Sequence, residues 1–377
     1  MTVARVDSAG CGAHLQAFAG MLGVLAGAWA TVCLPVVAAD SPEPHLVIIE
    51  RKIESLEERL KAAAARDYRV VGAVDGSAGF TKTNPIRLHL ERQPDGEPRL
   101  EYRVLEGPDS RQLEDAVNDE ASKGFRVLPL GVLRKIRPNP LGDRGSREAE
   151  SVVLVMERDG EGPPNEYKLI APGTPKQFRR EISKHTEVGF RIVGARGFDG
   201  GFLLTVLERP VIEQEYTPPV EGAEPQYITI DERDRQKLFD AVGDAAARGY
   251  RIVETVHQGF AGRGDVVLLD QATVPGRPYS YYFLGAPMAV DLEDLLNEGA
   301  NEGYRFRTGL DPRVELIMER APLEKVEAVY QTISGESAAK IEEEVASAMD
   351  DGYAFAGLYG DVVVMEKSPS VSSRHQR

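Results

Sequence analysis

The sequence predicts a mixed α+β protein made of six tandem β-α-β-β repeats, each a small sheet with one helix on a face, packed into an elongated array. Two observations lead to this fold class. A short motif that ends a helix and begins a strand recurs along the chain, and the residues before it align without a gap. The motif occurs at Gly124-Phe125-Arg126, Gly189-Phe190-Arg191, Gly249-Tyr250-Arg251, Gly303-Tyr304-Arg305 and Gly352-Tyr353-Ala354, with Asp67-Tyr68-Arg69 as a degenerate first copy.

The glycines of this motif have a structural role in the prediction. A helix commonly closes with a residue in the left-handed conformation, which glycine enters without a clash of its own Cβ. The predicted helix-ending residues are Gly124, Gly189, Gly249, Gly303 and Gly352. Asp67 takes this place in the first copy, and aspartate tolerates the left-handed conformation better than most residues.

Each repeat is expected to begin with a strand and a helix. Apolar residues stand eleven and seven positions before the motif glycine, a spacing that puts them on one helix face. They are Leu56 and Leu60, Leu113 and Val117, Phe178 and Ile182, Leu238 and Val242, Leu292 and Leu296, and Ile341 and Val345. Twenty-two positions before the motif a ring opens the first strand: His45, Tyr102, Tyr167, Tyr227, Tyr281 and Tyr330.

The third strand of each repeat follows the second and ends in Glu-Arg or a close variant. The runs 152–156 and 362–365 are apolar without alternation, which is typical of strands covered on both faces. The repeats are therefore expected to pack on one another. In the first repeat the run 86–90 alternates, so its outer face is expected to be exposed to solvent.

The chain divides on this basis into a signal peptide, six repeats and a disordered tail. Linkers rich in proline and glycine separate the repeats. The predicted ranges are 1–39 for the signal peptide, 45–92, 101–158, 166–209, 226–271, 281–320 and 326–367 for repeats 1 to 6, and 368–377 for the tail.

The N-terminal segment resembles an export signal. Apolar and small residues run from 17 to 39, and Val37-Ala38-Ala39 precedes Asp40 as a small-residue cleavage site. An uncleaved membrane anchor is the alternative, because the apolar run is long for a signal peptide. Cys11 and Cys33 both lie in this segment, so a mature chain from Asp40 would hold no disulfide or cysteine nucleophile.

The formal net charge of −15 argues against nucleic acid or anionic lipid as a partner, since both need a positive footprint. A membrane is expected to be contacted only through the N-terminal segment, if that segment stays uncleaved. The one basic cluster lies in the loop that starts at Arg134-Lys135 and continues with Arg137.

The repeat resembles a known bacterial family. The residues Tyr102-Arg103-Val104, the Gly124-Phe125-Arg126-Val127 motif and the ending Met156-Glu157-Arg158 are similar to those of the domain of unknown function 4177. The resemblance covers nearly all of residues 45–367 as six copies. Phenylalanine or tyrosine stands where the family often has tryptophan, and Asp67 stands for glycine. The resemblance implies no catalytic residue, because the family has no known activity.

The motif arginines are the most distinctive candidate binding residues. Arg126, Arg191, Arg251 and Arg305, with Arg69 before them, could form a series of anion sites for carboxylates or sugar acids. The structural alternative, which we favour, is a cross-strand ion pair with the acidic residue that ends the third strand of the same repeat. Ala354 interrupts the series in the last repeat, where a terminal cap is expected.

Other motifs carry less weight. Ser337-Ala338-Ala339-Lys340 matches a serine–lysine acylase motif, but a serine at the start of a helix is an ordinary N-cap. Arg263-Gly264-Asp265 resembles an adhesion tripeptide and is equally well explained as a turn. The histidines of the mature chain show no metal-binding spacing, so neither a metal nor another cofactor is expected.

The sequence thus indicates an exported, non-enzymatic repeat scaffold, periplasmic or secreted, that binds a protein or an envelope polymer. Two alternatives stay open. One is a hydrolase-type enzyme with a site between repeats, and the other is a membrane-tethered structural spacer.

Overall fold

The computed structural model describes residues 44–74, 85–94, 97–107, 110–137, 149–160, 163–198, 202–211, 225–258, 264–271, 279–284, 289–307, 316–321, 327–335, 337–360 and 362–368. They belong to one compact unit, Glu43–Arg377. The predicted signal peptide, and the tail beyond Ser368, lie outside the described residues. We keep the names repeat 1 to repeat 6 for the ranges given above.

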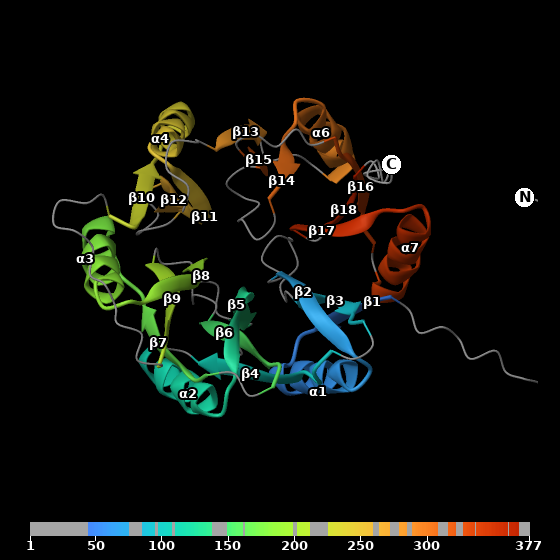
Figure 1. Ribbon diagram of the computed structural model, residues 1–377, viewed down its shortest axis with the longest axis horizontal. Helices are drawn as coiled ribbons and strands as arrows, with labels where there is room; N and C mark the ends of the chain where they lie inside the picture. Colours follow the sequence, from blue (N-terminus) through green and yellow to red (C-terminus); the bar gives the residue numbers. More distant parts are fainter. Residues whose placement is uncertain are drawn as a thin grey trace, which may run out of the picture. The chain divides into compact units, whose positions relative to one another are not determined.

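The described residues form six helices and eighteen strands that follow one another as strand, helix, strand, strand (Figure 1). The helices are α1 (Ile53–Ala64), α2 (Ser110–Ser122), α3 (Pro175–Thr186), α4 (Arg235–Ala247), α6 (Ala289–Asn301) and α7 (Ala338–Asp350). The first strands are β1 (His45–Glu50), β4 (Glu101–Gly107), β7 (Asn165–Ile170), β10 (Tyr227–Glu232), β13 (Ser280–Leu284) and β16 (Val329–Ile333). The second strands are β2 (Tyr68–Val74), β5 (Arg126–Arg137), β8 (Arg191–Phe198), β11 (Tyr250–Gln258), β14 (Arg305–Phe306) and β17 (Ala354–Tyr359). The third strands are β3 (Ile86–Arg92), β6 (Ala149–Arg158), β9 (Phe202–Pro210), β12 (Gly264–Gln271), β15 (Leu316–Arg320) and β18 (Val362–Lys367).

The helix ends have the geometry that the motif requires. Gly124 has a φ of 91°, and its N–H donates to the carbonyl of Ala121 while the N–H of Phe125 donates to the carbonyl of Glu120. These two hydrogen bonds form a Schellman closure, which satisfies carbonyls that the helix leaves free. Asp67 is the one non-glycine residue with positive φ, 65°, among the described residues.

Each repeat forms a three-stranded antiparallel sheet in which the third strand lies between the first and the second. The predicted mixed α+β class is confirmed by these six sheets and six helices. The central position of the third strand explains its composition. Both neighbours are hydrogen-bonded to it, and side chains on both of its faces are buried, as 152–156 and 362–365 predicted.

Alternate side chains of one third strand enter two different hydrophobic cores. In β6, Val153 and Val155 pack into the core around α1, whereas Val152, Leu154 and Met156 pack into the core around α2. This division follows from the two-residue period of a strand. A sheet therefore separates two cores, and each core is shared by two successive repeats.

Six such cores are present among the described residues, and each spans one pair of repeats. The pairs are repeats 1 and 2, 2 and 3, 3 and 4, 4 and 5, 5 and 6, and 6 and 1. The last pair shows that the first and last repeats are in contact, because Val47 of β1 lies in one core with Ile341 and Val345 of α7. The prediction that repeats share buried interfaces is confirmed.

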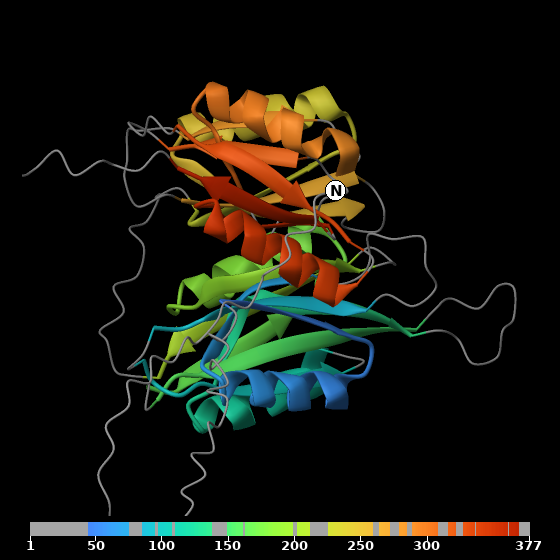
Figure 2. The same ribbon diagram turned by 90° about the vertical axis from the view of Figure 1, so that its right-hand side faces the viewer.

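The contacts correct two further predictions. We expected an elongated array with a capped end, but α7 contacts β1 as α1 contacts β4, so the succession of repeats is closed (Figures 1 and 2). We also expected the outer face of repeat 1 to be exposed to solvent. His89, on that face, is 1% exposed because repeat 6 covers it.

Candidate functional site

Three of the motif arginines, Arg69, Arg251 and Arg305, form ion pairs where neighbouring repeats meet. We call each such zone a joint, so that joint 1–2 lies between repeats 1 and 2. At joint 1–2, Arg69 of β2 places its Nη2 atom 2.6 Å from Oε1 of Glu157, which ends β6 in the next repeat. Glu157 is only 5% exposed, so this ion pair is shielded on the carboxylate side.

Two other motif arginines make the same contact across a joint. The pairs are Arg251 with Glu319 at 2.6 Å and Arg305 with Glu366 at 3.4 Å. The structural alternative named the acidic residue that ends the third strand of the same repeat, so it is wrong for these arginines and for Arg69. Arg191 pairs instead with Glu208 of its own repeat at 2.7 Å, and Arg126 makes no ion pair among the described side chains.

The joint beside Arg191 also differs in the residue that ends the next third strand. Repeat 4 carries Asp270 there instead of glutamate, and the side chain of aspartate is shorter by one methylene. An Oδ1 atom of Asp270 is buried without a hydrogen-bond partner. Burial raises the pKa of Asp270 to about 6.

A tyrosine at or near the start of the first strand, present in repeats 2 to 6, completes the joint. The hydroxyl of Tyr102 donates to Oε2 of Glu157 at 2.8 Å and accepts from the backbone N–H of Val70 in the preceding repeat at 3.0 Å. Burial, together with the negative charge of Glu157, raises the pKa of Tyr102 above its ordinary value. The hydroxyl therefore stays protonated and joins the two repeats through one buried oxygen.

The same arrangement recurs at other joints. The tyrosine, the preceding-repeat amide and the carboxylate are Tyr167, Val127 and Glu208; Tyr281, Ile252 and Glu319; and Tyr330, Phe306 and Glu366. At joint 3–4 the hydroxyl of Tyr227 accepts from the N–H of Ile192 at 3.1 Å. Burial, with the charge of Asp270 adding to it, raises the pKa of Tyr227 to about 12.

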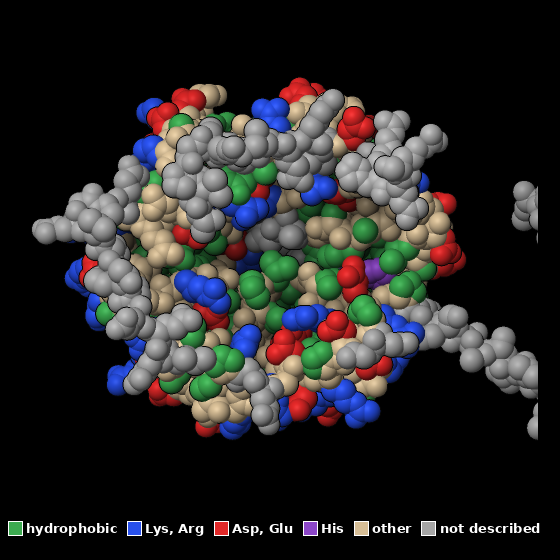
Figure 3. Space-filling model, in the orientation of Figure 1, with side chains coloured by type: hydrophobic (Ala, Val, Ile, Leu, Met, Phe, Trp, Pro, Cys, Tyr) green, Lys and Arg blue, Asp and Glu red, His purple; other side chains and the backbone are tan. Residues whose placement is uncertain are grey.

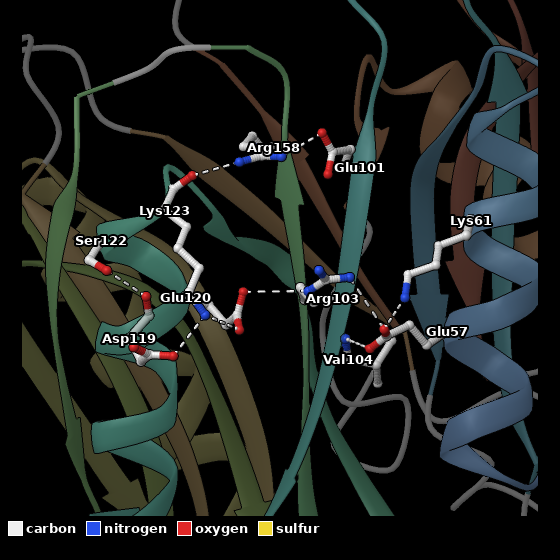
Figure 4. Close-up of polar contacts among 10 residues, drawn as sticks. All are labelled: Glu57, Lys61, Glu101, Arg103, Val104, Asp119, Glu120, Ser122, Lys123 and Arg158. Carbon is white, nitrogen blue, oxygen red and sulfur yellow. Dashed lines mark hydrogen bonds and ion pairs between the residues drawn. The ribbon is translucent and has the colours of Figure 1, made fainter.

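A helix glutamate forms a second bridge across several joints. Glu57 of α1 accepts from the N–H of Val104 on β4 at 2.9 Å, and Arg103 lies 3.5 Å from the same carboxylate (Figure 4). Burial by itself raises the pKa of Glu57, but the hydrogen bonds from Lys61 and Val104 outweigh it and the net shift is downward. Because β4 is an edge strand, this carboxylate satisfies an amide that the sheet leaves open.

The equivalent bridges involve Glu114 with Leu169, Glu293 with Thr332, and Glu342 with Val47. The sequence analysis missed both the tyrosines and these glutamates as joint residues. A signal for the glutamates was present, because Glu57, Glu114, Glu293 and Glu342 all stand ten residues before the motif position.

The arginine of the Glu-Arg ending acts inside its own repeat. Arg158 donates to the carbonyl of Lys123 at 3.0 Å (Figure 4). Its guanidinium also lies over the ring of Phe125, 4.8 Å from the ring centroid. The two residues of the Glu-Arg ending therefore have different structural roles. Glu157 joins two repeats, and Arg158 stabilises the helix end of one repeat.

The basic cluster does not form an open patch in its described part. Arg134 is 4% exposed, and Lys135 lies 3.3 Å from Glu106. The side chain of Arg137 lies outside the described residues. The face drawn in Figure 3 carries basic and acidic side chains intermixed.

The remaining motifs favour structural roles. The side chain of Ser337 accepts from the N–H of Lys340 at 3.3 Å, so the N-cap interpretation is confirmed. No group of three or more metal-binding side chains occurs in the part of the chain that the structure describes. Arg263, of the adhesion-like tripeptide, lies outside the described residues. None of the helices that the structure describes is long and apolar enough to cross a membrane.

Comparison with known proteins adds no further assignment. No protein-family model, curated protein or solved structure matches this chain. The resemblance of the motif to the domain of unknown function 4177 stays a prediction.

Proposed function

We propose that this protein is an exported, non-enzymatic repeat scaffold that binds a protein or an envelope polymer in the periplasm or outside the cell. The observation that supports a scaffold is the use of the repeated polar residues at the joints. Glu157 receives Arg69 and Tyr102 at once, and equivalent residues do the same at other joints. Side chains held in this way fix the relative position of repeats, and a fixed surface is what a broad binding partner needs.

Arg126 is the motif arginine best suited to contact a partner. Its cross-strand neighbour Glu157 is taken by Arg69. Glu208, which Arg126 would reach by the pattern of joint 1–2, is taken by Arg191. Among the described side chains Arg126 has no ion pair, although it is only half-buried.

A free guanidinium at such a place can bind a carboxylate or another oxyanion through two parallel hydrogen bonds. We therefore assign the first anion contact of the proposed scaffold to Arg126. Arg191, Arg251 and Arg305 are engaged in ion pairs, so they are secondary candidates.

The test is quantitative capture from the envelope extract of the source cells. Full-length protein is immobilised as wild type, as Arg126→Ala and as Arg179→Ala, which removes an exposed arginine of α3 and serves as a matched control. We expect at least one captured species to fall about tenfold with Arg126→Ala and to be unchanged with Arg179→Ala, while the unfolding midpoint of both variants stays within error of wild type.

Equal capture by both variants would contradict the assignment of Arg126. Capture no greater than by an unrelated immobilised protein would contradict the scaffold itself. The intact mass of protein recovered from the envelope tests export separately, because a chain cleaved after Ala39 begins at Asp40.

A further inference from the structure

The joint that closes the succession of repeats differs from the other five. Joint 6–1 keeps the helix bridge, in which the N–H of Val47 donates to Oε1 of Glu342 at 2.8 Å. It lacks the tyrosine and the arginine of the other joints. His45 stands in place of the tyrosine, and Ala354 stands in place of the arginine.

A third difference lies in the third strand. Two residues before its closing acidic residue, each of the other repeats has an aliphatic side chain that packs into the core shared with the preceding repeat. These side chains are Val155, Val206, Leu268, Ile317 and Val364. Repeat 1 has His89 at this position, facing repeat 6.

The two imidazoles are buried against a phenylalanine of repeat 6. His45 is 4% exposed and His89 is 1% exposed. The ring of His89 stacks on Phe355 of β17 with centroids 5.5 Å apart, and that of His45 lies 6.5 Å from the same ring. Neither Nε2 atom has a hydrogen-bond partner.

The packing at this point leaves little room for rearrangement. A Cβ added to Gly72 of β2 would lie 2.9 Å from Cζ of Phe355. The second strands of repeats 1 and 6 are thus in close contact where the imidazoles lie. A charged, hydrated imidazole does not fit such a contact without separating the two repeats.

The charges around the pair oppose protonation of His89 more than that of His45. Arg87, on the same strand, disfavours a positive His89, whereas Glu91 lies 3.9 Å from Nε2 of His45. From repeat 6, β17 has the sequence AFAGLY and supplies no carboxylate or cation, and α7 supplies Glu342, which is engaged with Val47. Burial also raises the pKa of Glu91, so acidification weakens its support of His45.

We propose that joint 6–1 is an acid-sensitive closure, which opens when His45 and His89 become protonated while the other five joints stay closed. This inference goes beyond the proposed scaffold and does not depend on the identity of its partner.

The direction of the pH effect follows from proton binding in the two states. Burial lowers the pKa of His89 to about 3, with the charges of Arg87 and His45 adding to it, and burial lowers the pKa of His45 from 6.5. In the open joint both imidazoles are hydrated and return toward 6.5. The open state then binds more protons, so the stability of the closed joint is complete above pH 6.5 and is lost as the pH falls toward 3.

Hydrogen exchange of the full-length chain measures this opening without labels. The amide of Val47 reports on joint 6–1, and the amides of Val104, Leu169 and Thr332 report on joints 1–2, 2–3 and 5–6 through the same contact with a helix glutamate. Comparison between these amides cancels the intrinsic pH dependence of exchange. The pKa of His89 is about 3 in the closed joint and near 6.5 in the open one. Lowering the pH from 7.5 to 5 should therefore reduce protection at Val47 roughly thirtyfold more than at the other three amides.

His89→Val places in repeat 1 the residue type found at the same position of repeat 2, and we expect it to remove most of the excess loss of protection. His89→Leu, which places the residue type of repeat 4 at this position, is the second variant if His89→Val does not fold. Equal loss at all four amides, no excess loss at Val47 at pH 5, or an excess that survives in the folded variant would each overturn the proposal.

Discussion

The tyrosine at joint 1–2 gives a sharp test of what holds the repeats together. Tyr102→Phe removes one hydroxyl and keeps the ring that packs in the core around α1. The backbone N–H of Val70 then loses its acceptor in a buried place, and Glu157 loses one of its two donors while keeping Arg69. Because the ring volume is unchanged, the effect reports the hydrogen bonds alone.

The size of the effect follows from these two losses. A buried N–H left without a partner costs about 1–3 kcal/mol, and a hydrogen bond to a charged group contributes about 1.5–3 kcal/mol. Arg69 is 44% exposed and can recover part of the loss at Glu157. We therefore expect Tyr102→Phe to lower the free energy of unfolding by about 2–4 kcal/mol.

Urea unfolding followed by far-ultraviolet circular dichroism measures this free energy. Tyr282→Phe is the matched control, because the Tyr282 hydroxyl makes one exposed 3.4 Å hydrogen bond to Glu298. Its expected effect is below about 0.5 kcal/mol. If Tyr102→Phe loses no more stability than Tyr282→Phe, the hydroxyl does not join the repeats and the reasoning is refuted.

Two further predictions concern backbone packing and a buried carboxylate. Gly194→Ala should destabilise the protein by about 1–3 kcal/mol in urea unfolding, because its Cβ would lie 2.8 Å from the carbonyl oxygen of Pro129 in the neighbouring repeat. Gly243→Ala, in α4 with open space around it, should stabilise by about 0.5–1 kcal/mol, and the opposite order of the two variants would contradict the close approach of β5 and β8. Asp270→Asn should stabilise by about 1–3 kcal/mol at pH 7.5 and by little near pH 4. The folded-state pKa of Asp270 is raised to about 6 by burial, so its ionisation destabilises the fold as the pH rises from 3.8 through 6. A pH-independent gain would show that ionisation of Asp270 is not the cause.

The local elements could be predicted from the sequence because their causes are local. The left-handed residue at Gly124 and the four-residue spacing of Leu113 and Val117 both act within one helix, and α2 buries both side chains. The unbroken apolar run 152–156 also indicated two covered faces. None of these inferences needs knowledge of which repeat lies where.

The partners across the joints could not be predicted, since they depend on how sheets are placed. Arg69 has Glu91 opposite it in the sheet but forms its ion pair with Glu157. Sequence spacing suggested the first pairing, whereas the approach of repeat 2 produces the second. His89 was misjudged for the same reason, because alternation along β3 cannot reveal that β17 covers it.

Closure of the succession explains why the deviant joint is the one between the chain's first and last repeats. Open arrays need a polar cap at each end, and a closed succession needs none. The bridge from Glu57 to Val104 spans 47 residues, whereas that from Val47 to Glu342 spans 295. In a flexible chain the longer loop costs about 1.6 kcal/mol more to close, and joints formed earlier shorten the effective loop, so this figure is a ceiling. Joint 6–1 is thus expected to form last, and it is also the joint that lacks the tyrosine and the arginine.

A chain in which joint 6–1 is open would expose both β1 and the face of repeat 6 that β1 covers in the closed joint. These surfaces are complementary, so the same residues that close one chain would join two at high protein concentration.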